Sequence, residues 1–384
     1  MGPTKVLGGA VLLSMLAGSC SWFFPPKLTK DGAIVGSPRH ADLEPRISVP
    51  TPEATIGEFV VTGARLTAGR LYSATVLEDG RVLFAGGELW TGNTASYFSS
   101  AELYEPGARK FRAAGSMQVA RSGHTAVLLR DGRVLIFGGS NTVGQPAELF
   151  DPSADKFSLT GKPVGGVSDH CAILLNDGRV LIGGYGWKFQ IYDPAQGRFR
   201  ESSHLHLTPT SPTMVLQRDG GVLIGVRGNQ GYYRDACVER FDPVTETFRV
   251  LPHSDPSCAA MDTAVRPEIA AGDRGTVTVL RDGKMLIAGG LDCSELPQPM
   301  RSGLGADVGM AVGAFARLQC PTTARAWIYD PAAKRKIEIE PMHTKRSGHT
   351  ATLLKDGTVL IVGGNSEPNS PDAEVYIPPG TGHS

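Results

Sequence analysis

The sequence predicts an all-β protein assembled from six copies of one four-stranded unit. Three observations support this fold class. Glycine and proline account for 48 and 27 of the 384 residues, so turns must be frequent and a helical bundle is disfavoured. An Asp-Gly pair between two apolar runs recurs along the chain, and each pair is followed by an apolar segment that ends in an Asp-Pro turn or a close variant. This repetition indicates a set of similar sheets stacked against one another.

Each copy begins with a predicted β-hairpin. Asp-Gly between apolar runs is the strongest short hairpin signal, because these residues tolerate a positive φ. The run after the turn, such as Val-Leu-Ile-Phe at residues 134–137, is continuously apolar, which predicts a strand covered on both faces. The six Asp-Gly pairs occupy residues 79–80, 131–132, 177–178, 219–220, 282–283 and 356–357.

A third and a fourth strand complete the unit. The third strand ends at the Asp-Pro turn, because Pro presets the first turn φ and Asp bonds to its own backbone. The last copy has no room for a fourth strand, but residues 58–63 match residues 110–115, which include the fourth strand of the first copy. We therefore expect residues 58–62 to pair beside residues 375–377, close the ring and remove its edges. The fourth strands are marked by Phe111, Phe157, Phe199, Phe248 and Ile337.

These motifs resemble kelch repeats, in the variant where Arg-Ser-Gly-His precedes the first strand, as at residues 121–124 and 346–349. That variant also occurs in the propeller of galactose-oxidase-like proteins. Successive Asp residues of the turns lie 52, 46, 42, 63 and 74 positions apart, around the kelch period of about 50. The resemblance covers residues 57–378 and implies a six-bladed β-propeller with four strands in each blade. We place this domain at residues 55–380, with a tail at 381–384.

The N-terminus predicts export. Residues 1–19 read as a signal peptide, with Lys5 before an apolar run that is too short to span a bilayer. The segment resembles a bacterial lipoprotein signal, which implies cleavage before Cys20 and acylation of that residue. Ala17 stands where such signals usually have Leu, and small residues here also fit an ordinary signal-peptidase site, so both processing routes stay open. Residues 20–54 are rich in proline and predict an extended tether.

Composition limits the partners. With 38 basic and 38 acidic residues, the chain has no net charge that would favour nucleic acid. We expect a location in the cell envelope, in the periplasm or on the surface, with membrane attachment through the N-terminal lipid only. The ligand is expected to be an unidentified protein or glycan.

Cysteine use also fits an oxidising compartment. Cys293 and Cys320 bracket the longest insertion, and Cys237 and Cys258 flank the outer part of the fourth copy toward one face. We expect disulfides within these two pairs. Cys171 lies in a predicted first strand and is expected to be buried and reduced.

The two faces of the predicted ring differ in loop length. One face carries tight Asp-Gly and Asp-Pro turns, whereas the opposite face carries all the long insertions. Variable loops on a rigid scaffold are the usual place for binding. These insertions are rich in aromatic and polar side chains, which suit a sugar or peptide. The candidate ligand-binding residues are Trp90, Tyr97, Asn141, Trp187, Arg227, Tyr232, Tyr233 and Asn365.

No catalytic residue, metal site or cofactor is predicted. The Asp residues of the Asp-Gly turns are required by turn chemistry. His124, His170 and His349 occupy equivalent positions, but no short ligand spacing supports a metal site, so we expect them to anchor the first strand to loop backbone. A Tyr-His pair like that of the galactose oxidase copper site is absent from the sequence.

The favoured function is therefore a binding or interaction module on the long-loop face. Because kelch propellers also include enzymes, the alternative is a mutarotase- or epimerase-like sugar enzyme at the channel mouth, using Arg227 with Asp235 or Glu239. A purely structural envelope component is the third hypothesis. A deep pocket that gathers Arg227 with carboxylates would favour the enzyme, and a flat aromatic surface would favour binding.

Overall fold

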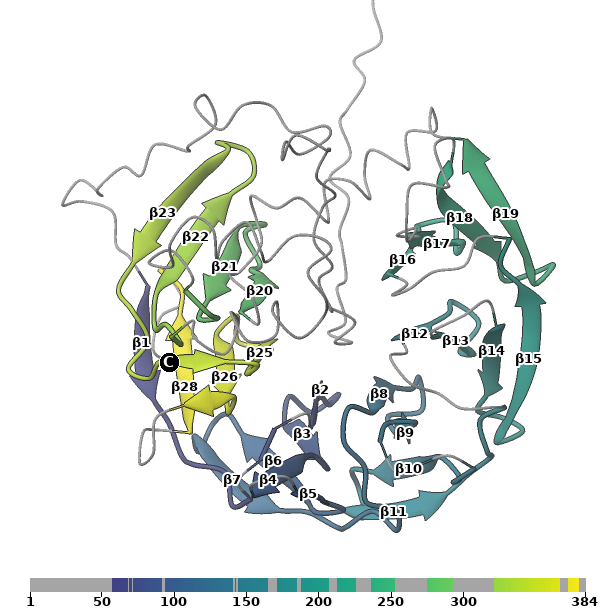
Figure 1. Ribbon diagram of the computed structural model, residues 1–384, viewed down its shortest axis with the longest axis horizontal. Coiled ribbons are helices and arrows are strands. Elements are labelled where there is room, and N and C mark those ends of the chain that lie inside the picture. Colours follow the sequence, from purple (N-terminus) through teal and green to yellow (C-terminus); the bar gives the residue numbers. More distant parts are fainter. Residues whose placement is uncertain are drawn as a thin grey trace, which may run out of the picture.

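The computed structural model describes residues 57–67, 69–70, 72–91, 94–140, 142, 144–164, 171–184, 188–206, 213–225, 236–252, 275–292, 321–366 and 372–379. These segments form strands and turns, arranged as six four-stranded antiparallel sheets and two short two-stranded ones. None of them is a helix of the length and apolarity needed to cross a membrane. Figure 1 shows the four-stranded sheets arranged radially, with the first hairpin strand of each sheet innermost. The predicted all-β class is confirmed, and the arrangement is consistent with a β-propeller.

We number the sheets 1 to 6 in the order of their Asp-Gly hairpins and give their strands from the inside outward. Sheet 1 consists of β2 (Ser73–Val76), β3 (Val82–Ala85), β6 (Ala101–Glu105) and β7 (Lys110–Ala113). Sheet 2 consists of β8 (Thr125–Leu128), β9 (Val134–Phe137), β10 (Glu148–Asp151) and β11 (Lys156–Leu159). Sheet 3 consists of β12 (Cys171–Leu174), β13 (Val180–Gly183), β14 (Lys188–Asp193) and β15 (Arg198–His204).

Sheets 4 and 5 repeat this order, and sheet 6 differs in its outer strand. Sheet 4 consists of β16 (Thr213–Leu216), β17 (Val222–Gly225), β18 (Ala236–Asp242) and β19 (Thr247–Pro252). Sheet 5 consists of β20 (Thr276–Val279), β21 (Met285–Ala288), β22 (Ala326–Asp330) and β23 (Arg335–Ile339). Sheet 6 consists of β25 (Thr350–Leu353), β26 (Val359–Val362), β28 (Ala373–Ile377) and the N-terminal β1 (Glu58–Val61).

The hairpins form for the reasons that the sequence indicates. In sheet 2 the Asp131 carboxylate accepts the backbone N–H of Arg133 at 3.0 Å, and Gly132 adopts a φ of 83°. Glycine suits this backbone conformation because it carries no Cβ. The strand after the turn is buried along its whole length in β3, β9, β13 and β26, as its continuous apolar run predicts.

Five hydrophobic clusters hold neighbouring sheets together. Each cluster combines apolar side chains from the facing sides of two sheets, and together they join sheets 6 and 1, 1 and 2, 2 and 3, 3 and 4, and 5 and 6. Covering both faces of each sheet removes most apolar surface from water. The core of the molecule is therefore divided among the contacts between sheets.

The first and last described strands meet in sheet 6. β1 pairs antiparallel with β28, in a register that places Phe59 opposite Tyr376. The two rings pack with their centroids 5.1 Å apart, as do the equivalent Phe111 and Tyr104 of sheet 1 at 4.9 Å. The predicted pairing of the N-terminal strand beside residues 375–377 is confirmed.

One strand marker was misplaced. The sequence pattern aligns Ile337 with the fourth-strand Phe residues, and Ile337 does lie in β23. In the observed register, however, Lys336 lies opposite Tyr329, just as Phe111 lies opposite Tyr104 in sheet 1. The marker is therefore off by one residue, which moves it to the other face of the sheet.

Candidate binding surface

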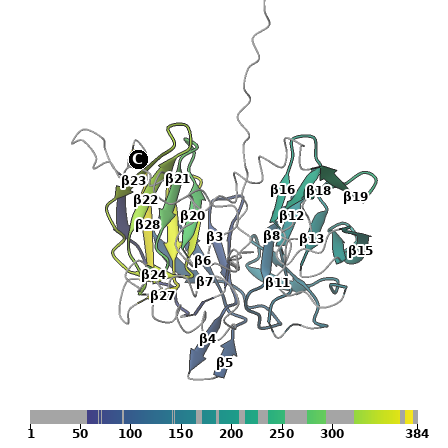
Figure 2. The same cartoon turned by 45° about the horizontal axis from the view of Figure 1, so that its top comes forward.

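A two-stranded ribbon projects from the long-loop face at sheet 1. It consists of β4 (Glu88–Thr91) and β5 (Thr94–Tyr97), and Figure 2 shows it extending away from the larger sheets. Its register pairs Glu88 with Tyr97 and Thr91 with Thr94, and a β-branched pair of this kind favours strand pairing. The long insertion that the sequence placed in the first copy is thus a second hairpin.

Glu88 fixes the base of this ribbon. Its backbone N–H and C=O both bond to Arg70, at 2.8 and 2.9 Å, which ties β4 to the segment that leads into β2. One carboxylate oxygen accepts the Trp90 indole N–H at 2.7 Å, and the other accepts the Ser122 hydroxyl at 2.8 Å. The Arg70 guanidinium lies 3.4 Å from the same carboxylate. Since Glu88 is buried, these contacts satisfy a charge that is removed from water.

The result is an exposed aromatic ring on a fixed support. Trp90 is 47% exposed and its neighbour Leu89 is 43% exposed. Adjacent residues of a strand point to opposite faces, so the two apolar side chains lie on either side of the ribbon. The Arg70 guanidinium lies 6.0 Å from the centre of the Trp90 ring. Tyr97, the partner of Glu88 across the ribbon, is half-buried.

Of the other predicted ligand-binding residues, only Asn365 lies in the described part of the chain, and it is not part of this ribbon. Asn365 lies in the short strand β27 (Asn365–Ser366), where its backbone pairs with Ser347 of β24 (Arg346–Ser347). The proposed sugar-enzyme carboxylate Glu239 is fully buried and accepts the backbone N–H of His206, so it caps a loop. The remaining predicted residues lie outside the described segments: Asn141, Trp187, Arg227, Tyr232, Tyr233 and Asp235.

Of the cysteines, Cys171 is buried in β12, as predicted, and its reduced state stays a prediction. The predicted disulfide partners are outside what the structure describes, except for the backbone of Cys237 in β18. Cys20 and the whole of residues 1–54 also lie outside the described segments.

Sequence reasoning missed a set of buried carboxylates on the third strands. In sheet 2 the Glu148 carboxylate accepts the backbone N–H groups of Gln118 and Val119, at 2.7 and 3.0 Å, and the Arg121 guanidinium at 3.2 Å. Sheet 6 repeats this arrangement with Arg346 and Glu374. The signal was present as a Glu two positions before the third-strand aromatic residue, an acid flanked by apolar residues.

The aligned histidines have a different partner from the one expected. The His124 imidazole lies 2.9 Å from the Ser73 hydroxyl, and the His349 imidazole lies 2.9 Å from the Thr276 hydroxyl. Each partner belongs to the first strand of the preceding sheet, so these histidines join neighbouring sheets through side chains. His170 lies outside the described residues. Within those residues, no group of three or more His, Cys, Asp or Glu side chains is placed to hold a metal ion.

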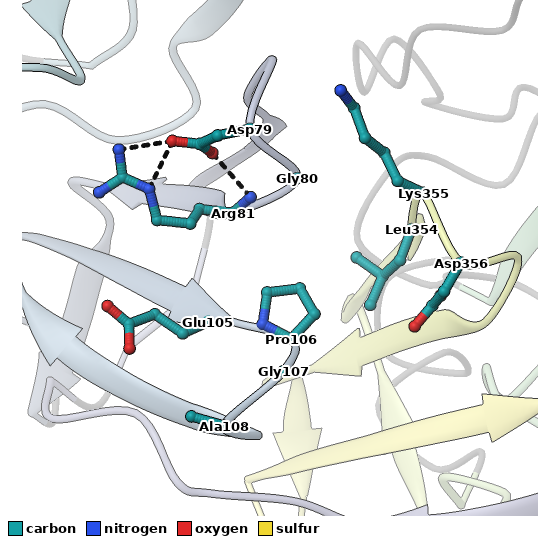
Figure 3. Close-up of a pocket in the computed structure, with 10 residues that line it drawn as sticks. All are labelled: Asp79, Gly80, Arg81, Glu105, Pro106, Gly107, Ala108, Leu354, Lys355 and Asp356. Atoms are coloured by element: carbon teal, nitrogen blue, oxygen red, sulfur yellow. Dashed lines mark hydrogen bonds and ion pairs between the residues drawn. The ribbon is translucent and has the colours of Figure 1, made fainter. Parts of the chain in front are cut away.

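A pocket of about 440 Å³ lies on the opposite, tight-turn face, between sheets 1 and 6 (Figure 3). Its size is that of a ligand site. The charged side chains that line it are already engaged: Asp79 bonds to Arg81 at 2.7 Å, Glu105 to Arg112 at 2.7 Å, Asp356 to the Thr358 hydroxyl at 2.7 Å, and Lys355 to the Glu78 carbonyl. The pocket was not predicted, and its paired charges make it a weaker candidate than the ribbon.

Comparison with known proteins gives matches among solved structures only. No family model matches the chain, and neither does any curated protein. Among solved structures, the chain is similar to YjhT, with 11% identity and a TM-score of 0.48 over 82% of this chain and 95% of that one. It is also similar to a fungal alcohol oxidase of the AA5 family in complex with copper, with 16% identity and a TM-score of 0.43 over 80% of this chain. The match spans 62% of the oxidase. At such identities the likeness carries no information on ligand or activity.

Proposed function

We propose that this chain is an exported six-bladed β-propeller whose ring is closed by the pairing of β1 with β28. The six four-stranded sheets and the five hydrophobic clusters between neighbours support this architecture. The register that places Phe59 opposite Tyr376 supports the closure, since it reproduces the aromatic pair of sheets 1 to 4. A closed ring leaves no strand edge open to aggregation.

The function that we propose for this propeller is binding of a protein or peptide partner through the β4–β5 ribbon. The observation that carries this proposal is the exposure of Trp90 on a support fixed by Glu88. Tryptophan is enriched among the residues that dominate protein interfaces, because it offers a large rigid apolar area at low entropic cost. A preformed ribbon also avoids the cost of ordering a loop on binding.

The contacts of Glu88 favour a protein partner over a sugar. A sugar site needs polar groups that are open to the hydroxyls of the ligand. The Glu88 carboxylate already accepts from Trp90 and Ser122 and pairs with Arg70. The ribbon projects outward, with Leu89 and Trp90 on its two sides, so it fits a groove on a partner.

Attachment to a membrane through Cys20 would present this ribbon to an envelope partner. The proposed tether at residues 21–54 contains six prolines, and about 3.1 Å per residue in an extended proline-rich chain gives a reach of roughly 100 Å. Mass spectrometry of the mature N-terminus tests the anchor. A diacylglyceryl group on Cys20 is expected, and an unmodified cysteine would mean ordinary signal-peptidase cleavage.

The binding proposal is tested by panning the chain that starts at residue 21 against a displayed peptide library and a glycan array in parallel. Peptide ligands are expected. Each ligand is then measured against Trp90→Ala, which should weaken binding by at least about tenfold, as for an interface hot spot. The melting temperature should barely change, because Trp90 is half exposed.

Leu159→Ala is the matched control, since Leu159 lies in β11, away from the ribbon, and is 48% exposed. Its affinity should equal that of the unmodified chain. Binding confined to glycans would contradict the protein partner. Equal affinities of Trp90→Ala and Leu159→Ala would remove the ribbon from the binding surface.

A further inference from the structure

Sheet 5 departs from the aromatic pairing of the other sheets. In the other five, a third-strand Tyr or Phe packs on a fourth-strand Phe, with ring centroids 4.7 to 5.1 Å apart. Both rings belong to the cluster shared with the preceding sheet, as Tyr104 and Phe111 do between sheets 1 and 6. In sheet 5 the residue opposite Tyr329 is Lys336. A cation therefore replaces an aromatic ring on the side of sheet 5 that is turned away from sheet 6.

A second departure lies beside the first. Trp327 occupies the third-strand position that carries a buried Glu in sheets 1, 2, 4 and 6. The Lys336 ammonium lies 4.4 Å from the centre of the Trp327 ring, and the Arg325 guanidinium lies 5.0 Å from it. Sheet 5 thus presents one half-buried indole with two cations against it.

The two cations of this group are paired unequally. Arg325 is engaged with Glu338 through two hydrogen bonds of 2.7 and 3.1 Å and lies 3.8 Å from the Asp292 carboxylate. Among the described residues, Lys336 has the indole contact but no carboxylate within ion-pair distance. Burial and the nearby Arg325 charge lower the pKa of Lys336, and the Glu338 charge opposes them in part. A half-buried ammonium in this state gains by binding an anion.

Sheet 4 adds a cation from the other side. The third-strand residue that faces the next sheet is Leu or an equivalent aliphatic in five sheets, as Leu103 is opposite Leu83 in sheet 1. In sheet 4 the residue at this position, opposite Leu223, is Arg240, which pairs with Asp219 at 2.8 Å. The side of sheet 4 that would meet sheet 5 in the proposed ring therefore carries an Arg–Asp ion pair where the other sheets carry an aliphatic side chain.

We propose that the side of sheet 5 carrying Trp327 and Lys336 is a binding site for an anionic ligand with a flat apolar part. The anionic group, a carboxylate or a phosphate, would bind the Lys336 ammonium, and the apolar part would lie along the Trp327 indole. Charge complementarity and the flat ring select this ligand class. Only the contribution of Arg240 rests on the proposed ring, because the other groups all belong to sheet 5.

The test uses the chain labelled with 5-fluorotryptophan, which gives one ¹⁹F resonance for each of its four tryptophans. Trp327→Phe assigns the resonance of interest. Benzoate and phenyl phosphate are the anionic probes, and benzamide is the neutral match for benzoate. Saturable shifts of the Trp327 resonance are expected with an anionic probe and not with benzamide, and the tighter of the two anions identifies the preferred group.

Variants separate this site from a structural role. Lys336→Met should weaken anion binding by at least about tenfold, whereas Lys336→Arg should retain it. Lys336→Phe restores the aromatic pair of the other sheets, so it should fold and lose anion binding. Lys284→Met is the matched control on the same sheet, since Lys284 already pairs with Asp282 at 2.9 Å, and it should bind normally.

Three results would overturn the proposal. These are an absence of any shift in the unmodified chain, an equal shift with benzamide, and unchanged binding in both Lys336→Met and Lys336→Phe. The anion-site proposal would still stand if Trp90→Ala left peptide binding unchanged, because the ribbon and the anion site share no residue.

Discussion

Arg346 and Glu374 are both fully buried, and the guanidinium donates to the carboxylate at 2.9 Å. Arg346 belongs to the motif that precedes the first strand of sheet 6, and Glu374 belongs to its third strand. The carboxylate also accepts the backbone N–H groups of His343 and Thr344. These contacts therefore join two segments of sheet 6, residues 343–347 and β28, that are separated along the chain.

Removing one partner of this pair should destabilise the protein strongly. Glu374→Leu leaves the Arg346 guanidinium buried without its carboxylate, and we expect a loss of about 3–5 kcal/mol of unfolding free energy. The double variant Arg346→Met/Glu374→Leu should be less destabilised than Glu374→Leu alone, because no charge stays buried. Denaturant unfolding followed by circular dichroism measures both. A double variant less stable than the single one would contradict the argument.

The contact between β1 and β28 should stabilise the folded protein as much as a core contact does. Phe59 is 7% exposed and packs on Tyr376, so Phe59→Ala is expected to cost about 3–5 kcal/mol. Deleting residues 55–64 should expose the edge of β28 and cause aggregation or a loss of cooperative melting. Light scattering and calorimetry test this outcome, and a truncated chain that melts as sharply as the intact one would refute closure by β1.

Burial of His349 should make stability depend on pH. Burial, together with the nearby Arg346 charge, lowers its pKa from 6.5 to about 3. The unfolded chain therefore binds a proton at His349 below about pH 6.5 while the folded chain does not, so stability must fall as pH decreases through that window. His349→Gln should lose less stability than the unmodified chain between about pH 7 and pH 5.

The exposed residue His204 provides the control for this experiment. His204→Gln should show the pH dependence of the unmodified chain. Carboxylates such as Asp131 and Asp177 have lowered pKa values, because burial is outweighed by their hydrogen bonds to Arg133 and Arg179, so they contribute at lower pH. If the unfolding free energy of His349→Gln and of His204→Gln depended on pH in the same way, His349 would have no role in acid sensitivity.

The disulfides remain a sequence-based prediction. We expect Cys293–Cys320 and Cys237–Cys258, with Cys171 as a thiol, since Cys171 is buried in β12. Non-reducing peptide mapping of the exported protein should recover the two linked peptides and alkylated Cys171 only after unfolding. A bridge that includes Cys171 would reject this pairing.

Much of the fold was predictable because its signals are local. The Asp131-Gly132 turn depends on a side chain that bonds two residues on and on a glycine at positive φ, and both are visible as residue types. The fourth strand of sheet 6 is visible in the sequence because residues 58–63 match the internal repeat at residues 110–115. The β4–β5 ribbon was not predicted, because residues 88–100 were treated as an irregular insertion although Leu89 and Trp90 lie before a Gly-Asn turn pair.

The sequence by itself determined the repeated sheets, their hairpins and the pairing of the two ends of the chain, since each depends on residue types at short spacing. Tertiary structure alone decided that Arg346 and Glu374 leave water together, and that Lys336 rather than Ile337 lies opposite Tyr329. Burial and register depend on contacts between residues far apart in the chain, and a one-residue shift of register moves a side chain to the other face. The residue types that line a binding surface are therefore visible in the sequence, but which of them meet is settled only by packing.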